Sequence, residues 1–105
     1  MNKITAIKGM SDVLPAESAE WQAVLSAARD LLKTFGFVEI ITPIVEPTEL
    51  FLRSVGETSS IVEKEMYTFP DKKGLSLTLR PEGTAPVVRA YVESGMAMKE
   101  PLAKF

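Results

Sequence analysis

Two side chains that can bind a small charged ligand, Glu82 and Thr84, flank Gly83 in the segment Arg-Pro-Glu-Gly-Thr at residues 80–84. A carboxylate such as that of Glu82 can hold a cation, for example the ammonium group of an amino acid. The hydroxyl of Thr84 has one donor and two acceptor positions, so it can cap a helix and still accept a hydrogen bond from a ligand. A charged turn with a capping threonine and no ligand explains the same residues, and the spacing alone leaves both interpretations open.

A β-hairpin is predicted immediately before this segment. Residues 75–79 alternate leucine with serine and threonine, which is the period-two pattern of a half-buried strand. A polar turn at residues 70–74 separates them from residues 63–69, which lead into an earlier strand. Pro81 disfavours the helical conformation for Arg80, so the second strand is expected to stay extended up to that residue.

A helix is predicted immediately after the segment. Residues 85–94 are rich in alanine, valine and tyrosine, and Gly95 follows them as a suitable residue for ending a helix. Gly83 allows the backbone to change direction sharply, and Thr84 is a favoured N-cap residue. The positive end of this helix helps to keep the carboxylate of Glu82 ionised.

A long amphipathic helix is predicted at residues 18–35, starting at Pro15 or Ser18 and ending at Gly36. Its apolar side chains recur every three or four positions as one stripe, which is typical of a helix that packs on other elements. They are Trp21, Val24, Leu25, Ala28, Leu31, Leu32 and Phe35. The β-branched and aromatic residues 37–42 then predict a strand that stops at Pro43.

A short helix opening at Thr48 and ending at Gly56 is expected next, with Glu49 and Glu46 placed near its positive end. The polar residues 54–65 are the best candidate for a mobile loop. The loop contains Glu57, Glu63 and Glu65, which fit a solvated loop far better than a catalytic cluster.

Composition narrows the class of protein. The chain has 105 residues, a formal net charge of −2, no cysteine and no histidine, so it predicts at most one globular domain without disulfides or a zinc site. The slightly acidic balance offers no general attraction to nucleic acid. The sequence has no apolar run of membrane-spanning length and no signal-peptide pattern, so we expect a cytoplasmic protein that does not contact a membrane.

Several stretches, in order along the chain, resemble histidyl-tRNA synthetases. Residues 79–84 resemble the segment in which a glutamate and a threonine of these enzymes bind the amino group of histidine, and residues 8–15 resemble the arm that precedes their first catalytic-domain helix. Residues 18–46 resemble motif 1 of class II aminoacyl-tRNA synthetases. The resemblance implies an α+β fold, with residues 1–105 as the N-terminal portion of a class II catalytic domain, an antiparallel sheet with flanking helices.

The resemblance also assigns roles to single residues. Glu82 and Thr84 would bind the amino group of histidine, and Gly83 would shape the turn. Motif 1 forms the homodimer interface in the family, which implies that Phe37, Ile40 and Pro43 lie at such an interface. An amphipathic helix followed by an edge strand explains the local sequence of motif 1 equally well.

The activity that the resemblance implies is that of a histidine–tRNA ligase, with histidine, ATP with Mg²⁺ and histidine tRNA as substrates of the whole enzyme. The chain stops at Phe105, before the motif 2 loop that binds ATP in the family, so these residues alone are expected to be inactive and hold no assigned catalytic residue or metal ligand. An alternative is the histidine-sensing regulatory subunit of ATP phosphoribosyltransferase. Its counterpart of residues 82–83 is less regular, so the intact Arg-Pro-Glu-Gly-Thr favours the ligase. A third hypothesis, a freestanding dimerisation module, requires Phe105 to be a natural terminus.

Overall fold

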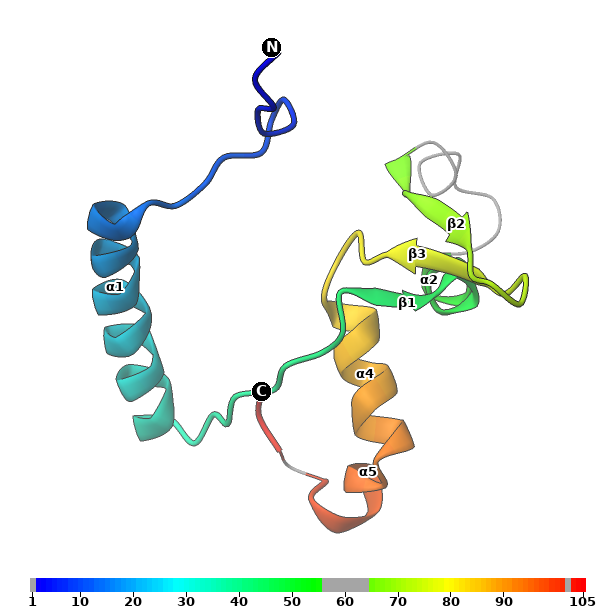
Figure 1. The fold of residues 1–105 in the computed structure, drawn as a ribbon. Helices are drawn as coiled ribbons and strands as arrows, with labels where there is room; N and C mark the ends of the chain where they lie inside the picture. The colour runs from blue at the N-terminus through cyan, green and yellow to red at the C-terminus, as the bar shows by residue number, and fades with distance from the viewer. Residues whose placement is uncertain (1, 56–64, 102) are drawn as a thin grey trace. The chain divides into compact units, whose positions relative to one another are not determined.

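The computed structural model describes residues 2–55, 65–101 and 103–105. This part of the chain divides into two compact units, Met1–Glu39 with Lys104, and Ile40–Ala103 with Phe105 (Figure 1). The predicted helix end at Gly56 and most of the predicted loop, including Glu57 and Glu63, lie outside the described residues. Among the described residues, no helix is long and apolar enough to span a bilayer.

The first unit contains the long helix α1 (Pro15–Thr34), and its prediction is confirmed. Pro15 occupies the first helical turn, where its fixed φ suits the helix and its missing amide costs no hydrogen bond. The helix ends in a left-handed glycine as predicted, since Gly36 has a φ of 81°. The amide of Phe37 donates to the carbonyl of Leu32 over 3.1 Å, and that of Gly36 to Lys33 over 3.0 Å. This pair of bonds is a Schellman motif and satisfies the last carbonyls of the helix.

The apolar stripe of α1 remains exposed. No residue of α1, all of which are described, is buried. More than half of the side-chain surface is exposed at Trp21, Val24, Leu31 and Phe35. The packing face that the periodicity predicts is therefore present on the helix, but the described residues of the first unit do not cover it.

The predicted strand at residues 37–42 is wrong. Phe37 forms one isolated parallel bridge with Lys104, and the amide of Val38 donates to the carbonyl of Lys104 over 2.9 Å. Residues 39–42 pair with no other strand among the described residues. β-branched composition favours a strand only where a neighbouring chain segment offers hydrogen bonds. The strand forms after Pro43 instead of before it.

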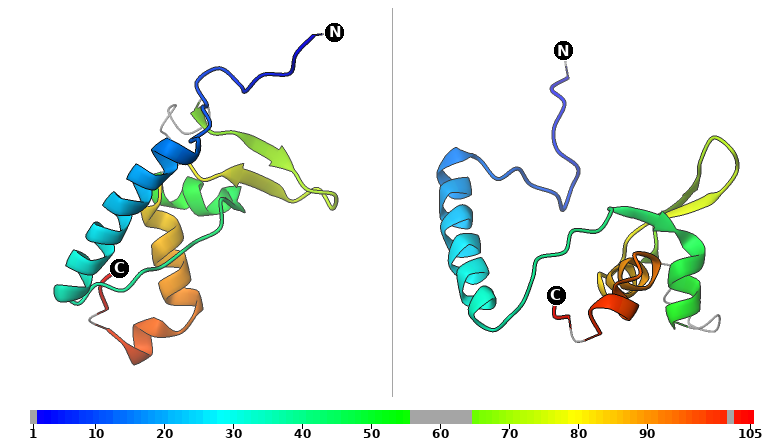
Figure 2. Two further views of the ribbon diagram at one scale, coloured as in Figure 1. Left: turned by 60° about the vertical axis from the view of Figure 1, so that its left-hand side comes forward. Right: turned by 90° about the horizontal axis from the view of Figure 1, so that it is seen from below.

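In the second unit, the described residues form one antiparallel sheet of three strands, β1 (Val45–Pro47), β2 (Thr68–Pro70) and β3 (Ser76–Leu79), in the order β1-β3-β2. The predicted hairpin is confirmed as β2 and β3, and Figure 2 shows it from two further sides. Its turn is closed by Asp71, whose carboxylate accepts hydrogen bonds of 2.8 Å from the amides of Lys73 and Leu75.

The helices α2 (Thr48–Val55), α4 (Thr84–Glu93) and α5 (Met96–Lys99) lie in the described part of the second unit. The start of α2 at Thr48 and the helix before Gly95 are confirmed, and Gly95 has the expected positive φ of 79°. The short α5 was not predicted. Helix α2 contacts β1, β3 and α4, and Phe51 and Pro86 are fully buried. The core of this unit therefore lies where α2 meets the sheet and α4.

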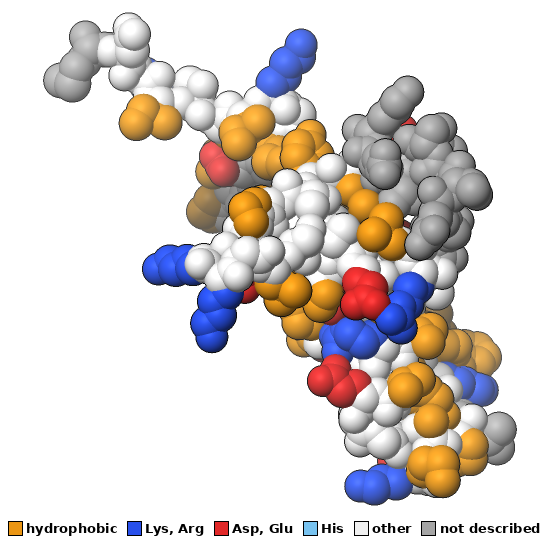
Figure 3. All heavy atoms as spheres, turned by 90° about the vertical axis from the view of Figure 1, so that its right-hand side faces the viewer, with side chains coloured by type: hydrophobic (Ala, Val, Ile, Leu, Met, Phe, Trp, Pro, Cys, Tyr) orange, Lys and Arg blue, Asp and Glu red, His pale blue; other side chains and the backbone are white. Residues whose placement is uncertain are grey.

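The buried face of β3 carries hydroxyl groups instead of leucines. Thr78 is 0% exposed, whereas Leu75 and Leu79 are 56% and 40% exposed. Figure 3 shows that apolar side chains are exposed on one face of the molecule. The Thr78 hydroxyl lies 2.8 Å from that of Thr48 on α2 and 3.0 Å from that of Thr68 on β2. Because each buried hydroxyl finds a partner, this polar face can be covered by α2 at little cost.

Candidate functional site

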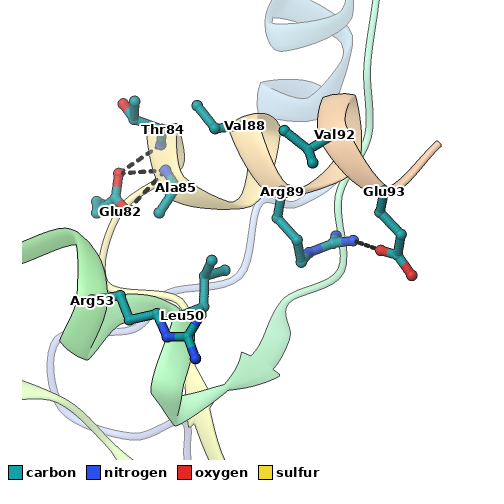
Figure 4. Close-up of a pocket in the computed structure, with 9 residues that line it drawn as sticks. All are labelled: Leu50, Arg53, Glu82, Thr84, Ala85, Val88, Arg89, Val92 and Glu93. Carbon is teal, nitrogen blue, oxygen red and sulfur yellow. Dashed lines mark hydrogen bonds and ion pairs between the residues drawn. The ribbon is translucent and has the colours of Figure 1, made fainter. Parts of the chain in front are cut away.

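Glu82 lies in the turn between β3 and α4 and caps the helix. Its carboxylate accepts hydrogen bonds from the amide of Thr84 over 2.6 Å and from that of Ala85 over 3.1 and 3.3 Å (Figure 4). These amides belong to the first helical turn and have no acceptor within the helix. A negative charge at this end of the helix is also favourable because of the helix dipole.

The predicted capping role of Thr84 is wrong. Helix α4 already includes Thr84, and the N-cap position belongs to Gly83, which has no side-chain hydrogen bond to offer. The Thr84 hydroxyl has no hydrogen-bond partner among the described residues. Because Glu82 does the capping, the Thr84 hydroxyl stays available to a ligand.

Gly83 does not redirect the chain by adopting a conformation that only glycine allows. Its φ of −106° and ψ of −15° are open to every amino acid. No atom lies within 4 Å of the place that a Cβ atom would occupy. The sharp turn predicted from this glycine is therefore made without special backbone freedom.

An open pocket of about 930 Å³ lies beside α4 and includes Glu82 and Thr84. Leu50 and Arg53 line it from α2, and the other lining side chains come from α4 and the turn before it (Figure 4). Its apolar lining consists of Leu50, Ala85, Val88 and Val92. The pocket thus combines one carboxylate and one hydroxyl at the helix N-terminus with apolar walls.

This combination suits a small molecule with an ammonium group and an apolar or aromatic body. An ionised carboxylate accepts about four hydrogen bonds, and the capping amides of Thr84 and Ala85 leave capacity on Glu82. An ammonium group has three donors, which match Glu82 and the Thr84 hydroxyl. The body of such a ligand can then lie along Val88 and Leu50.

Arg89, whose role the sequence does not decide, makes two ion pairs. Its guanidinium donates to Glu46 of β1 from Nε over 3.0 Å and from Nη2 over 2.8 Å, and to Glu93 from Nη1 over 2.5 Å. The hydrogen bond that Arg89 donates to Glu46 raises the pKa of Arg89, desolvation opposes that rise, and the hydrogen bond to Glu93 adds to it. Glu46 is thus the partner of Arg89, a contact that the sequence analysis does not predict.

Arg80 holds the segment in front of β1. Its amide donates to the carbonyl of Ile44 over 2.9 Å, and its Nη1 donates to the carbonyl and hydroxyl of Thr42 over 3.0 and 3.1 Å. These contacts join the end of β3 to the approach of β1. Arg80 therefore serves the structure.

The residues predicted for a dimer interface fall in different units. Phe37 belongs to the first unit, and Ile40 and Pro43 belong to the second. Phe37 and Ile40 are partly buried, and Pro43 is exposed. Their role at an interface stays a prediction.

Sequence reasoning missed the contributions of α2 and β1 to this site. Leu50 and Arg53 line the pocket, and Glu46 holds Arg89. A glutamate between Val45 and Pro47 on a short strand is the one signal that could have pointed to a buried ion pair, because charged residues are rarely buried without a partner.

Among the described residues, no group of three or more His, Cys, Asp and Glu side chains is placed to hold a metal ion.

Comparison with known proteins identifies the family. The histidyl-tRNA synthetase family profile matches residues 9–102. The chain belongs to the histidyl-tRNA synthetase family. It is 61% identical over 101 residues to the histidine–tRNA ligase of Pelobacter propionicus, a match that covers 96% of this chain and 24% of the relative. The chain thus spans about a quarter of the length of that relative.

Solved structures of the histidyl-tRNA synthetase family have the same fold. The structure of apo S. aureus histidyl-tRNA synthetase matches with a TM-score of 0.78 and 41% identity, covering 93% of this chain and 22% of that one. A second match is a Bacillus halodurans protein described as an ATP phosphoribosyltransferase regulatory subunit/histidyl-tRNA synthetase. Its TM-score is 0.67 and its identity 28%, and the match covers 90% of this chain and 24% of that one. The α+β fold with an antiparallel sheet and flanking helices, as found in class II synthetases, is therefore confirmed.

Proposed function

We propose that this chain is the N-terminal part of the catalytic domain of a histidine–tRNA ligase, with residues 18–46 as motif 1. The enzyme would activate histidine with ATP and transfer it to histidine tRNA, in the cytoplasm. The identity of 61% to a histidine–tRNA ligase supports the activity. The regulatory subunit of ATP phosphoribosyltransferase has less support, because the structure that carries both names matches at 28% identity.

We assign the amino group of histidine to Glu82 and Thr84. The observation that carries this assignment is the carboxylate of Glu82, held at the N-terminus of α4 by two backbone amides and exposed to an open pocket. A carboxylate held in place before the ligand arrives loses little freedom on binding, which favours affinity. The apolar walls of the pocket would contact the body of histidine.

The pocket beside α4 offers no unpaired arginine to the phosphates of ATP. The two arginines that line the pocket are both paired, Arg53 with Glu49 and Arg89 with Glu46 and Glu93. A triphosphate needs cationic groups that are placed to meet its negative charge. We therefore assign ATP binding to residues of the enzyme outside this chain.

The exposed apolar stripe of α1 supports a homodimer in which motif 1 is covered by a second copy. Large apolar side chains exposed in one continuous group mark a surface that another protein covers, and Trp21, Val24, Leu31 and Phe35 are such a group. Phe37, Ile40 and Pro43 would join this interface in the whole enzyme.

The activity can be tested in a chimaera. This chain would replace the aligned segment of the P. propionicus histidine–tRNA ligase, and histidine-dependent exchange of labelled pyrophosphate into ATP would be measured. We expect exchange in the chimaera and its loss on Glu82→Gln. A folded chimaera without exchange would overturn the proposed activity. Binding of histidine to the chain by titration calorimetry, without exchange in the chimaera, would instead favour the histidine sensor.

A further inference from the structure

The ion pair between Glu46 on β1 and Arg89 on α4 joins two elements of the second unit that are far apart in sequence. We propose that Glu46 and Arg89 are positioning residues of the Glu82–Thr84 site. They would fix helix α4 relative to β1 so that its N-terminus presents Glu82 and Thr84 to the amino group of the ligand. This inference rests on the proposed binding of histidine at that site.

The geometry of the pair favours a positional role. One oxygen of Glu46, Oε1, accepts from both Nε and Nη2 of Arg89 over 3.0 and 2.8 Å. The Glu46 side chain is 3% exposed and that of Arg89 is 26% exposed. Hydrogen bonds between charged groups are directional and short, and Arg offers a rigid planar set of donors. Apolar contacts between α4 and its neighbours are not directional, so they allow the helix to slide by a small distance.

Arg89 lies close enough to Glu82 and Thr84 that a shift of Arg89 along the helix axis also moves these two residues. It follows Thr84 by five residues in the same ten-residue helix, which is about 7.5 Å along the helix axis at 1.5 Å per residue. Helix α4 is hydrogen-bonded internally, so a shift at Arg89 moves the amides of Thr84 and Ala85 that hold Glu82.

Arg89 is occupied by its partners and does not contact the ligand in this proposal. Three of its nitrogen atoms donate to carboxylates, Nε and Nη2 to Glu46 and Nη1 to Glu93. Glu93 is exposed at 72%, whereas Glu46 is buried. An exposed pair contributes little, so the buried partner is the one that fixes the helix.

The test uses the chimaera described above, which carries the complete chain. Arg89→Met keeps the length of the side chain and removes its charge, and Glu46→Gln removes the opposite charge. We expect either variant to raise the KM for histidine on the order of tenfold to a hundredfold, because small misplacements of binding groups have effects of this size. The KM for ATP is expected to stay unchanged, since we assign ATP binding to residues outside this chain.

A purely structural role predicts a different result. If the ion pair only stabilises the fold, its loss reduces the fraction of folded enzyme and hence the apparent kcat, and the KM for histidine stays unchanged. A single variant leaves one charge without its partner and can fail to fold, so the double variant Glu46→Gln/Arg89→Met is measured as well. It buries no unpaired charge, and we expect it to fold and to keep the raised KM for histidine.

The matched control is Arg29→Met. Arg29 pairs with Glu39 over 2.9 Å in the first unit, but both side chains are about half exposed, at 51% and 53%. We expect it to leave both KM values unchanged. A histidine KM of the double variant equal to that of the unsubstituted chimaera would overturn the positional role. An unsubstituted chimaera without exchange would count against the proposed function instead.

Discussion

Glu82 has two roles that substitution can separate, capping α4 and binding the ammonium group of the ligand. Glu82→Ala removes both the acceptor and the charge. Glu82→Gln keeps an amide oxygen that can accept from the amides of Thr84 and Ala85, but it has no negative charge. We therefore expect both variants to lose histidine binding, whereas only Glu82→Ala loses most of the cap.

The size of the capping effect follows from the contacts of the carboxylate. Glu82 accepts from one amide at 2.6 Å and from a second at 3.1 Å. Loss of a side-chain cap costs about 1 kcal/mol. The charge at the helix end contributes about 0.3 kcal/mol more for an exposed group, the low end of the usual range because solvent screens it. We expect Glu82→Ala to destabilise α4 by about 1.3 kcal/mol and Glu82→Gln by about 0.3 kcal/mol.

Amide hydrogen exchange measures this effect within one helix. A loss of about 1.3 kcal/mol corresponds to roughly ninefold lower protection of the α4 amides, and about 0.3 kcal/mol corresponds to less than a factor of two. The amides of α1 in the first unit are the internal reference and should be unaffected. Histidine affinity of the same proteins is measured by calorimetric titration.

Two results would refute this reasoning. If Glu82→Ala leaves the protection of α4 unchanged, the capping bonds at Thr84 and Ala85 do not stabilise the helix. If Glu82→Gln binds histidine as tightly as the unsubstituted chain, the negative charge is not what holds the ligand.

Two further substitutions test the fold. Thr78→Val keeps the shape of the side chain but leaves the hydroxyls of Thr48 and Thr68 without this partner, so we expect a loss of about 1–3 kcal/mol in the free energy of unfolding, measured by urea denaturation. A stability equal to that of the unsubstituted chain would contradict a buried hydroxyl network. Gly36→Ala places a Cβ atom at a φ of 81° and is expected to cost about 1–2 kcal/mol. Gly36→Asn should cost less, and the fluorescence of Trp21 in α1 reports both.

Local features of the fold could be predicted because their causes lie within a few residues. Proline in the first turn, the apolar stripe and the left-handed Gly36 define α1 from end to end. The hairpin of β2 and β3 follows from a polar turn between two strand-forming segments. The candidate ligand groups are also local, since Glu82 and Thr84 are separated by a single residue.

Features that depend on a distant partner could not be predicted in this way. Residues 37–42 have the composition of a strand, but a strand needs a neighbour, and β1 forms at Val45–Pro47 because β3 pairs there. The spacing assigns the cap of α4 to Thr84, whereas Glu82 caps the helix by accepting from the amides of Thr84 and Ala85.

The sequence by itself determined α1, the hairpin of β2 and β3, the helix that follows it and the chemistry of the residues at 82–84. Only the tertiary structure decided which face of β3 is buried, because alternation shows two faces without saying which one α2 covers. It also decided that Glu46 pairs with Arg89 across 43 positions. Pairing between such distant residues depends on how the strands and helices pack, and no local pattern of residues contains that information.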